Sequence, residues 1–284
     1  MSKIPILLDT DPGSDIDDAI AISYLLKKRD CELLGITTMT GPVDQRAAIA
    51  EVLCHAAGRR DVPIHCGRSD VLAYGPGQAA CPHYASIADL PHRKDRKSDE
   101  AVDFLRKTIR SRPGEITLLS IGPLTNIALL FALDPEIPHL LKEFVSMAGV
   151  FERNIEAEWN CACDPVATAM VARSVRPRHY WTPLDVTLRC TMSKDECHAK
   201  FKGPLLELVL RMAGDWFKRT DQIIFHDPLA TASIFNPGLC TFEHGRVEVN
   251  PEKGQTKFAE GEGGDYVALH VDPSRFFEEY FSVF

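Results

Sequence analysis

The sequence lacks the features that mark fibrous, disordered and disulfide-rich chains. Its 284 residues contain no internal repeat, no low-complexity tract and no Ser/Gly-rich linker. The nine cysteines are an odd number and include no Cys-x-x-Cys pair, which argues against a complete disulfide framework and against a zinc ribbon. Reduced thiols in a cytoplasmic protein are the simplest interpretation.

Concentrated positive charge is also missing. The longest basic run is Lys27-Lys28-Arg29, and 40 acidic residues against 32 basic ones give a formal net charge of −8. A chain that binds nucleic acid needs a basic face to neutralise phosphates. Nucleic acid is therefore not expected as a partner.

Long apolar runs are scarce. The start, Met1-Ser2-Lys3 and a brief apolar stretch that ends at Asp9, is too short for a secretory signal. Residues 116–133 are uncharged over 18 positions, about the lower limit for a membrane-spanning helix, but Gly122-Pro123 divides them. We expect a strand, a turn and a helix there, and no association with a membrane.

The overall makeup is that of a globular protein, with 45% hydrophobic and 25% charged residues. Apolar segments alternate between short runs and helical spacing. We expect one domain, residues 1–284, of the α/β class: an open, mainly parallel sheet with helices on both faces. The expected strands are residues 4–8, 32–38, 62–65, 116–121, 144–150 and 180–184, and the expected helices are residues 19–26, 45–57, 98–111, 124–133 and 164–173.

The last forty or so residues differ from this pattern. Residues 241–249, 256–259 and 266–271 are predicted strands with no helices between them, and residues 273–281 are a predicted helix. They predict a small antiparallel C-terminal appendage at one edge of the sheet. Open parallel sheets bind ligands beyond the carboxyl ends of their strands, so the functional residues are expected there.

Directly after the first predicted strand the sequence gathers acidic side chains. Five carboxylates fall within ten residues: Asp9, Asp11, Asp15, Asp17 and Asp18. Capping of the next helix explains one or two of them. Two carboxylates 4 Å apart repel by ~4 kcal/mol at an effective dielectric near 20, so bringing several together predicts a bound cation.

The donor type indicates which cation. Oxygen ligands with few nearby His or Cys residues favour a hard ion, and a flexible loop able to supply bidentate carboxylates favours Ca²⁺ over Mg²⁺. The loop is not an EF-hand. Counting from Asp9, glycine stands at the fifth position instead of the sixth, and Ile20 occupies the place of the bidentate Glu.

These residues belong to a wider set of motifs. Asp9-Thr10-Asp11-Pro12-Gly13 followed by Asp17-Asp18-Ala19 resembles the signature of the inosine-uridine-preferring nucleoside hydrolase family. The later segments that fit the same family, in order, are Gly122-Pro123-Leu124-Thr125-Asn126-Ile127-Ala128, Glu158-Trp159-Asn160 with Asp164-Pro165, Pro183-Leu184-Asp185-Val186-Thr187, and His226-Asp227-Pro228. Each motif alone is weak, but their ordered set covers most of the chain.

The resemblance implies calcium-dependent hydrolysis of the N-glycosidic bond of ribonucleosides, in nucleoside salvage. It implies that Ca²⁺ is held by Asp11, Asp18, the backbone carbonyl of Thr125 and Asp227. The side chains expected to grip the sugar hydroxyls are Asp15, Asp17, Asn154, Glu158 and Asn160.

Catalytic roles follow from the chemistry. A cation lowers the pKa of its bound water, and we assign to Asp11 the removal of the proton during attack. Nearby carboxylates and carbonyls stabilise the oxocarbenium-like sugar. The base leaves poorly as an anion, and His226 is assigned as its proton donor. The alternatives are a structural His226, an Asp227 that only caps a helix, an Asn126 that only forms a turn, and an Asp185 that is only a structural acceptor.

The sequence departs from the commonest family pattern in several places. Two extra residues, such as Asp15-Ile16, leave open whether Asp15 or Asp17 faces the sugar, and Thr40-Gly41-Pro42 stands where a Gly-Asn pair is common. Asn154 lies closer than usual to Glu158. The base preference cannot be read from the sequence, because Trp216 and Phe225 suit either stacking on a base or helix packing.

Some candidate features have simpler interpretations. Cys161 and Cys163 are read as small packed thiols, because Cys-x-Cys lacks the spacing of a zinc site. The apolar stripe of Phe276, Phe277, Tyr280 and Phe281 is typical of a core or of a subunit interface. A homodimer or homotetramer is therefore plausible.

Two rival functions stay open at this stage. A strand followed by Asp9-x-Asp11 also suits a haloacid-dehalogenase-type phosphatase, although the later lysine and acidic pair of that family have no clear equivalent. The second rival is a non-catalytic ribose- or nucleoside-binding module, which Pro42 and the altered spacings favour.

Overall fold

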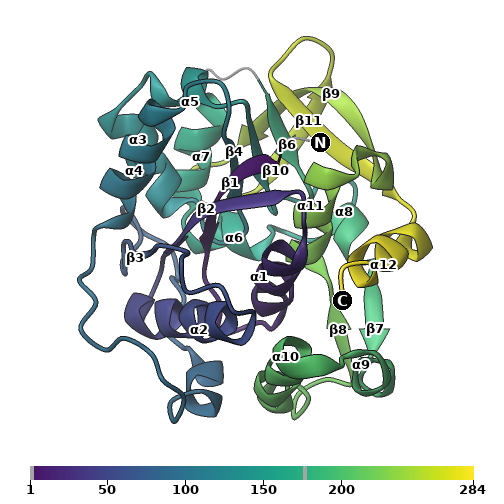
Figure 1. The fold of residues 1–284 in the computed structure, drawn as a ribbon. Helices are drawn as coiled ribbons and strands as arrows, with labels where there is room; N and C mark the ends of the chain where they lie inside the picture. Colours follow the sequence, from purple (N-terminus) through teal and green to yellow (C-terminus); the bar gives the residue numbers. More distant parts are fainter. Residues whose placement is uncertain (1–2, 175–177) are drawn as a thin grey trace.

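A computed structural model describes residues 3–174 and 178–284. Met1 and Ser2, part of the start that is too short for a secretory signal, lie outside the described residues. A nine-stranded sheet runs through the described residues in the order β10-β9-β11-β6-β5-β4-β1-β2-β3 (Figure 1). Its strands are β1 (Ile4–Thr10), β2 (Cys31–Thr38), β3 (Ile64–Cys66), β4 (Thr117–Ser120), β5 (Glu143–Ser146), β6 (His179–Trp181), β9 (Cys240–Val249), β10 (Thr256–Glu260) and β11 (Asp265–Val271).

Strand β1 occupies the middle of the parallel part and pairs with β2 on one side and β4 on the other. Its run of apolar residues is buried on both faces, as expected for a strand covered by helices. Leu7 contributes to one hydrophobic cluster, whereas Ile6 and Leu8 contribute to the cluster on the opposite face. The alternation of a strand therefore turns one apolar run into two cores.

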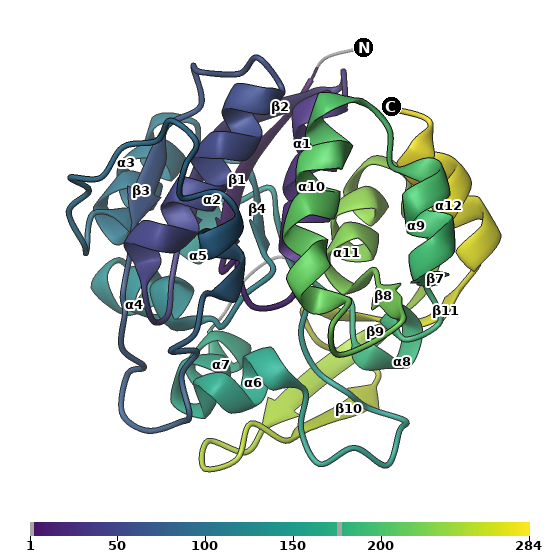
Figure 2. The same cartoon turned by 90° about the horizontal axis from the view of Figure 1, so that it is seen from below.

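Helices cover both faces, as the sequence predicts. In Figure 2, α1 (Asp17–Lys27), α10 (Gly203–Trp216) and α11 (His226–Phe235) lie on one side of β1 and β4, and α3 (Ala101–Ser111) and α4 (Thr125–Leu133) lie on the other. The helices that contribute to the larger cluster are α1 (Asp17–Lys27), α2 (Val43–Ala56), α8 (Leu184–Thr187), α9 (Lys194–Lys200), α10 (Gly203–Trp216), α11 (His226–Phe235) and α12 (Pro273–Phe281). The helices that contribute to the smaller one are α3 (Ala101–Ser111), α4 (Thr125–Leu133), α5 (Ile137–Leu140) and α7 (Pro165–Arg173).

The C-terminal strands form the expected antiparallel edge. Strand β11 adds to β6 in parallel, and β9 then pairs antiparallel with both β11 and β10. The predicted α/β class, with a mainly parallel sheet and an antiparallel appendage, is confirmed. The expected single domain, residues 1–284, stays a prediction.

Two strand predictions are too long at their carboxyl ends. Residues 144–150 were expected as one strand, but β5 ends at Ser146, and residues 180–184 reduce to β6, which ends at Trp181. The chain leaves the sheet at these points: Gly149 has a φ of +89°, and Leu184 begins α8. The sequence stays apolar past the ends of β5 and β6 because the residues that follow are buried in loops beside the site.

The sequence pattern gave no element between residues 188 and 225. The structure has there a two-stranded antiparallel sheet of β7 (Thr191–Ser193) and β8 (Gln222–Ile224), with α9 (Lys194–Lys200) and α10 between them. The 14-residue helix α10 was missed although it is long enough to show a helical period, whereas three-residue strands are too short to give a clear period in the sequence. Short α6 (Trp159–Cys163) was missed for the same reason.

The C-terminal aromatic stripe is part of the core. Phe276 and Tyr280 of α12 are fully buried and surround Phe225, whose ring centroid lies 6.0 Å from that of Phe276 and 5.6 Å from that of Tyr280. Packing therefore accounts for Phe225 as well, and stacking on a base does not.

Other sequence expectations are met. Residues 116–133 form β4, a turn and α4, and within residues 3–174 and 178–284 no helix is long and apolar enough to cross a membrane. All nine cysteines are free, and Cys161 and Cys163 are buried.

We expect Phe276→Ala to lower the free energy of unfolding by about 3–5 kcal/mol, because it leaves a cavity among packed rings. The control is Glu278→Ala on the exposed side of α12, which should change the same quantity by about 0.5 kcal/mol or less. Urea unfolding of both variants tests this, and equal losses would contradict a core role for the stripe.

Candidate active site

A cavity of about 420 Å³ opens beyond the carboxyl ends of β1, β4 and β5, where Asp11, Ile121 and Met147 follow the strands. This volume is within the range of small-molecule sites, and the position is the one expected for an open parallel sheet. The residues that line it are Asp11, Ser14, Asp15, Asp17, Asp18, Gln78, Ala80, Pro82, Ile121, Met147, Glu158, Trp159, Asn160, Leu184, Trp216, Arg219, His226 and Asp227.

Helix capping does not explain the acidic loop after β1. Helix α1 has Ile16 at its N-cap, and no side chain caps it. Asp18 instead faces back to the strand: its Oδ1 accepts hydrogen bonds from the Thr10 hydroxyl at 2.5 Å and from the Asp11 backbone N–H at 3.1 Å. The loop is thus folded around a carboxylate.

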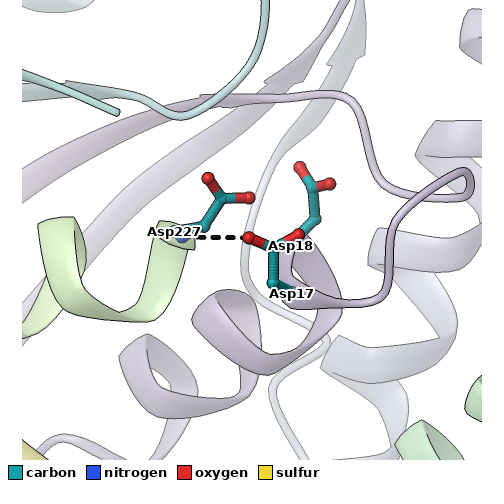
Figure 3. Close-up of side chains that lie close together, drawn as sticks. All are labelled: Asp17, Asp18 and Asp227. Carbon is teal, nitrogen blue, oxygen red and sulfur yellow. Dashed lines mark hydrogen bonds between the residues drawn. The ribbon is translucent and has the colours of Figure 1, made fainter. Parts of the chain in front are cut away.

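Three of the acids come together from two helices that are far apart in sequence. Asp17 and Asp18 begin α1, Asp227 lies in the first turn of α11, and one carboxylate oxygen of each lies within 4.8 Å of the others (Figure 3). The Asp227 backbone N–H donates to Asp17 Oδ2 at 3.0 Å. All three are buried, so their charges are poorly screened.

Burial and mutual repulsion disfavour the charged forms of these acids. The pKa of Asp17 and that of Asp227 are raised well above the ordinary value, first by burial and then by the neighbouring carboxylates. Burial raises the pKa of Asp18 to about 6, although the hydrogen bond from Thr10 opposes the shift. The ionised forms of the three acids are therefore unfavourable in the folded chain, and a bound cation would stabilise them.

Asp11 lies beside the three clustered acids, at the end of β1. Its pKa is raised by burial and then by Asp18, while the guanidinium of Arg46 opposes the shift. Arg46 Nη1 lies 3.9 Å from Asp11 Oδ2. Arg46 is fully buried in α2 and was not singled out in the sequence.

Asp9 and Asn126 form hydrogen bonds between strand ends that the sequence did not predict. Asp9 is fully buried, and its Oδ1 accepts hydrogen bonds from the Thr37 hydroxyl and, at 2.9 Å, from Asn126 Nδ2. Burial raises its pKa to about 7. Asn126 also donates to the Thr38 carbonyl at 3.2 Å and accepts from the Arg68 backbone N–H at 3.0 Å, so it joins several strand ends and is more than a turn residue.

Glu158 and Asn160 are held rigidly at the cavity wall. The Glu158 carboxylate caps α6 and accepts from the backbone N–H groups of Asn160, Cys161 and Gly149 at 2.6, 3.0 and 3.2 Å. Asn160 Nδ2 donates to the carbonyls of Ile121 and Met147, at the ends of β4 and β5. These bonds fix both side chains before any ligand binds.

His226 lines the cavity at the start of α11. Its Nδ1 lies 2.7 Å from the Thr187 hydroxyl, and burial lowers the pKa of the imidazole to about 4. The ring is therefore neutral near pH 7. Asp185, in α8, accepts from the backbone N–H groups of Phe151 and Glu152 at 2.8 and 2.9 Å, which makes it a structural acceptor.

Two of the predicted site residues lie apart from the cavity lining. Thr125 begins α4, and its hydroxyl donates to Asp164 Oδ2 at 2.8 Å. Asn154 is exposed in the loop between β5 and α6. Neither lines the cavity formed by the described residues, so their roles stay predictions.

A mixed aromatic and cationic wall completes the cavity. Trp216, which the sequence offered as a possible stacking residue, ends α10 and donates from Nε1 to the Gln222 carbonyl at 3.0 Å. The Arg219 guanidinium lies 5.1 Å from the Trp216 ring centroid. Arg219 and Gln78 were missed, because only the fold brings them beside the acids. The half-exposed Trp159 lies within the Glu158-Trp159-Asn160 motif but was assigned no role.

Solved structures share this architecture. A plant nucleoside hydrolase aligns with a TM-score of 0.85 and 24% identity over 99% of this chain and 98% of that one. A purine-preferring ribonucleoside hydrolase from Gardnerella vaginalis aligns with a TM-score of 0.82 and 27% identity over 98% of this chain and 97% of that one.

Sequence relatives agree. An uncharacterized protein of Schizosaccharomyces pombe is 34% identical over 88% of this chain and 86% of its own length. Uridine nucleosidase 1 of Arabidopsis thaliana is 32% identical over 87% of this chain and 78% of its own length. The family model described as inosine-uridine preferring nucleoside hydrolase matches residues 6–278. Because that match spans nearly the whole chain, the protein belongs to the inosine-uridine preferring nucleoside hydrolase family.

Proposed function

We propose that this chain is a calcium-dependent nucleoside hydrolase that cleaves the N-glycosidic bond of ribonucleosides to free base and ribose. The observation that carries the proposal is the buried acidic cluster of Asp17, Asp18 and Asp227 at a cavity of nucleoside size. The relatives named as a uridine nucleosidase of Arabidopsis thaliana and a non-specific ribonucleoside hydrolase of Escherichia coli support the reaction class.

The donor set fits a hard divalent cation. The clustered groups are carboxylates and all are buried. Burial, and then mutual repulsion, raise the pKa of Asp17 and that of Asp227, so a cation would favour their ionised forms. We assign the ligands as Asp11, Asp18, Asp227 and the Thr125 carbonyl. Bound Ca²⁺ would lower the pKa of the attacking water and anchor the sugar hydroxyls.

The remaining acids and amides serve the sugar. Asp11 accepts the proton of the attacking water, and the nearby Arg46 favours its ionised form. Asp15, Asp17, Asn154, Glu158 and Asn160 hold the ribose hydroxyls. Glu158 and Asn160 are already oriented by backbone groups, so they stabilise positive charge on the sugar without reorganising.

His226 faces the departing base. We assign proton donation to the imidazolium form, in which Nδ1–H donates to the Thr187 hydroxyl oxygen and the Nε2 proton passes to the base, leaving a neutral ring. Its pKa of about 4 makes the imidazolium scarce at neutral pH, so the ring takes up a proton from solvent and passes it on as negative charge develops on the departing base.

Membership in the hydrolase family argues against the phosphatase alternative. The binding module without turnover is tested directly, by measuring binding and product in the same samples.

We expect the purified protein to release reducing sugar from a panel of purine and pyrimidine ribonucleosides, and chelator treatment to abolish the release until Ca²⁺ is restored. Asp11→Ala should lower kcat by about 10²-fold or more, because it removes the base. The control is Asp30→Asn, an exposed acid just before the amino end of β2.

The outcomes separate the candidate functions. Nucleoside binding with no sugar release would indicate a binding module, and phosphate release from phosphomonoesters with Mg²⁺ would indicate the phosphatase. Turnover by Asp11→Ala at the wild-type rate would remove Asp11 from the mechanism.

The pKa values predict how stability depends on pH. Asp15 and Asp18 titrate at about 7 and about 6 in the folded chain against an ordinary value of 3.8, so the metal-free folded state binds more protons than the unfolded state between these limits. The free energy of unfolding of the metal-free protein should therefore fall as pH rises from about 4 to about 7.

Calcium should reverse this trend. At pH 8 and 100 times its Kd, Ca²⁺ should stabilise the protein by about 2.7 kcal/mol, or about 5–10 °C in Tm, and by less at pH 5, where protons compete for the carboxylates. Asp18→Asn should lose most of this shift while Asp30→Asn keeps it, as measured by calorimetry. Equal Ca²⁺ shifts at both pH values would contradict the assigned ligands.

The role of His226 predicts a dependence on the leaving group. His226→Gln should lower kcat for inosine and uridine by about 10²-fold or more, but should change hydrolysis of 4-nitrophenyl riboside little, because nitrophenolate leaves without a proton. Thr187→Val should show a weaker version of the same pattern. Equal losses on both substrate types would assign His226 to binding or folding.

A further inference from the structure

Arg46 is an arginine with no exposed surface, and it points from α2 into the floor of the site. Its Nε donates to the Thr40 carbonyl at 2.7 Å, and its Nη1 donates to the carbonyls of Asp11 and, at 3.2 Å, Pro12. Its Nη2 donates to the carbonyls of Gln78 at 2.9 Å and Ala80 at 3.4 Å. One guanidinium thus binds three separate loops.

The loop after β2 is strained where Arg46 holds it. Thr40 has a φ of +57°, the left-handed region that a β-branched residue rarely adopts. Such strain persists only where the surroundings fix it, and it concentrates at functional sites. Here the Thr40 carbonyl accepts from Arg46, and its Oγ1 accepts from the Gln78 backbone N–H at 3.0 Å.

The third loop forms part of the cavity wall. Gln78 and Ala80 line the cavity, and they lie in residues 67–81, which contain neither helix nor strand. No sheet ladder therefore places this wall. The hydrogen bonds from Arg46 connect it to the acidic loop, and the bond from the Gln78 backbone N–H to Thr40 connects it to the loop after β2. Just beyond this wall, the His83 backbone N–H donates to the Gly13 carbonyl at 3.1 Å.

We propose that Arg46 is a positioning residue: its guanidinium sets the distance between the acidic loop, which holds the metal ligand Asp11, and the wall at Gln78 that bounds the nucleoside. The inference rests on the proposed function, because it concerns the same site. Because Arg46 contacts both the acidic loop and the wall, a change at this one side chain is expected to alter both the affinity for the metal and the KM for the nucleoside.

A lysine cannot replace this arrangement. All five N–H donors of the planar fork have carbonyl acceptors, whereas an ammonium at the end of a flexible stem keeps the charge but reaches fewer of them. The carbonyls left behind would be buried without partners. Comparing arginine with lysine therefore separates the geometry of the group from its charge.

The test measures Ca²⁺ affinity by calorimetry on chelator-treated protein, and KM for inosine and uridine, in Arg46→Lys. We expect Ca²⁺ affinity to fall about 10- to 100-fold and KM to rise, while thermal unfolding stays cooperative. The control is Arg96→Lys, because Arg96 is also largely buried but binds Glu51 and the Ile64 carbonyl at the sheet edge. A variant that only loses stability, with wild-type Ca²⁺ affinity and KM, would overturn the proposal.

A second pair of variants keeps Arg46 intact in case Arg46→Lys does not fold. Thr40→Ala removes the hydroxyl that binds the wall, and Thr40→Ser retains it. Thr40→Ala should raise KM about tenfold with Ca²⁺ affinity unchanged, and Thr40→Ser should behave like the wild type. Equal KM values in the two variants would overturn the coupling.

The Ca²⁺ affinities of the variants are measured without turnover, so this part of the test does not depend on hydrolase activity. If the wild-type protein hydrolyses no nucleoside, the proposed function fails, but calorimetry of Ca²⁺ binding in Arg46→Lys and Arg96→Lys still decides whether Arg46 organises the acidic loop.

Discussion

The repulsion between buried carboxylates is the constraint on which the structure of this nucleoside hydrolase depends. Asp17, Asp18 and Asp227 lie close together away from water, where charges are poorly screened and where their pKa values rise. This repulsion alone would push the groups apart, or burial and repulsion together would keep them protonated. The fold holds them together through covalent and hydrogen-bonded geometry, so the site is poised to bind a cation that removes the repulsion.

That geometry is provided by backbone groups and buried polar side chains around the acids. Asp18 is held by Thr10 and by the backbone N–H of Asp11, and Glu158 is held by three backbone N–H groups. Asn126 ties Asp9 to a neighbouring strand end. These contacts leave little freedom to the side chains, which is what electrostatic stabilisation of a short-lived sugar cation requires. The carboxylates of the site are thus held rigidly. The aromatic and cationic wall, with Trp216 and Arg219, lies on α10 and the loop that follows it.

The sequence predicted most elements of the sheet and the acidic loop correctly, because both depend on local pattern. The apolar run of β1 and the carboxylates after it are adjacent in the chain, and helix α12 has a clear apolar stripe. The prediction failed for β7, β8 and α6, whose few residues give no period, and it also missed α9 and the longer α10. It extended β5 into a loop that is buried for a different reason. Arg46 was overlooked because an arginine in a helix normally faces solvent.

The sequence by itself determined the alternation of strands and helices, the oxygen-rich donor set and the ordered motifs, since each is written in residue type and short-range spacing. Only the tertiary structure decided that Asp227 meets Asp17 and Asp18, that Phe225 belongs to the core, and that one guanidinium joins three loops. These pairings link residues that are tens to hundreds of positions apart, and the distance between such residues is set by how the helices pack on the sheet, which no local pattern encodes.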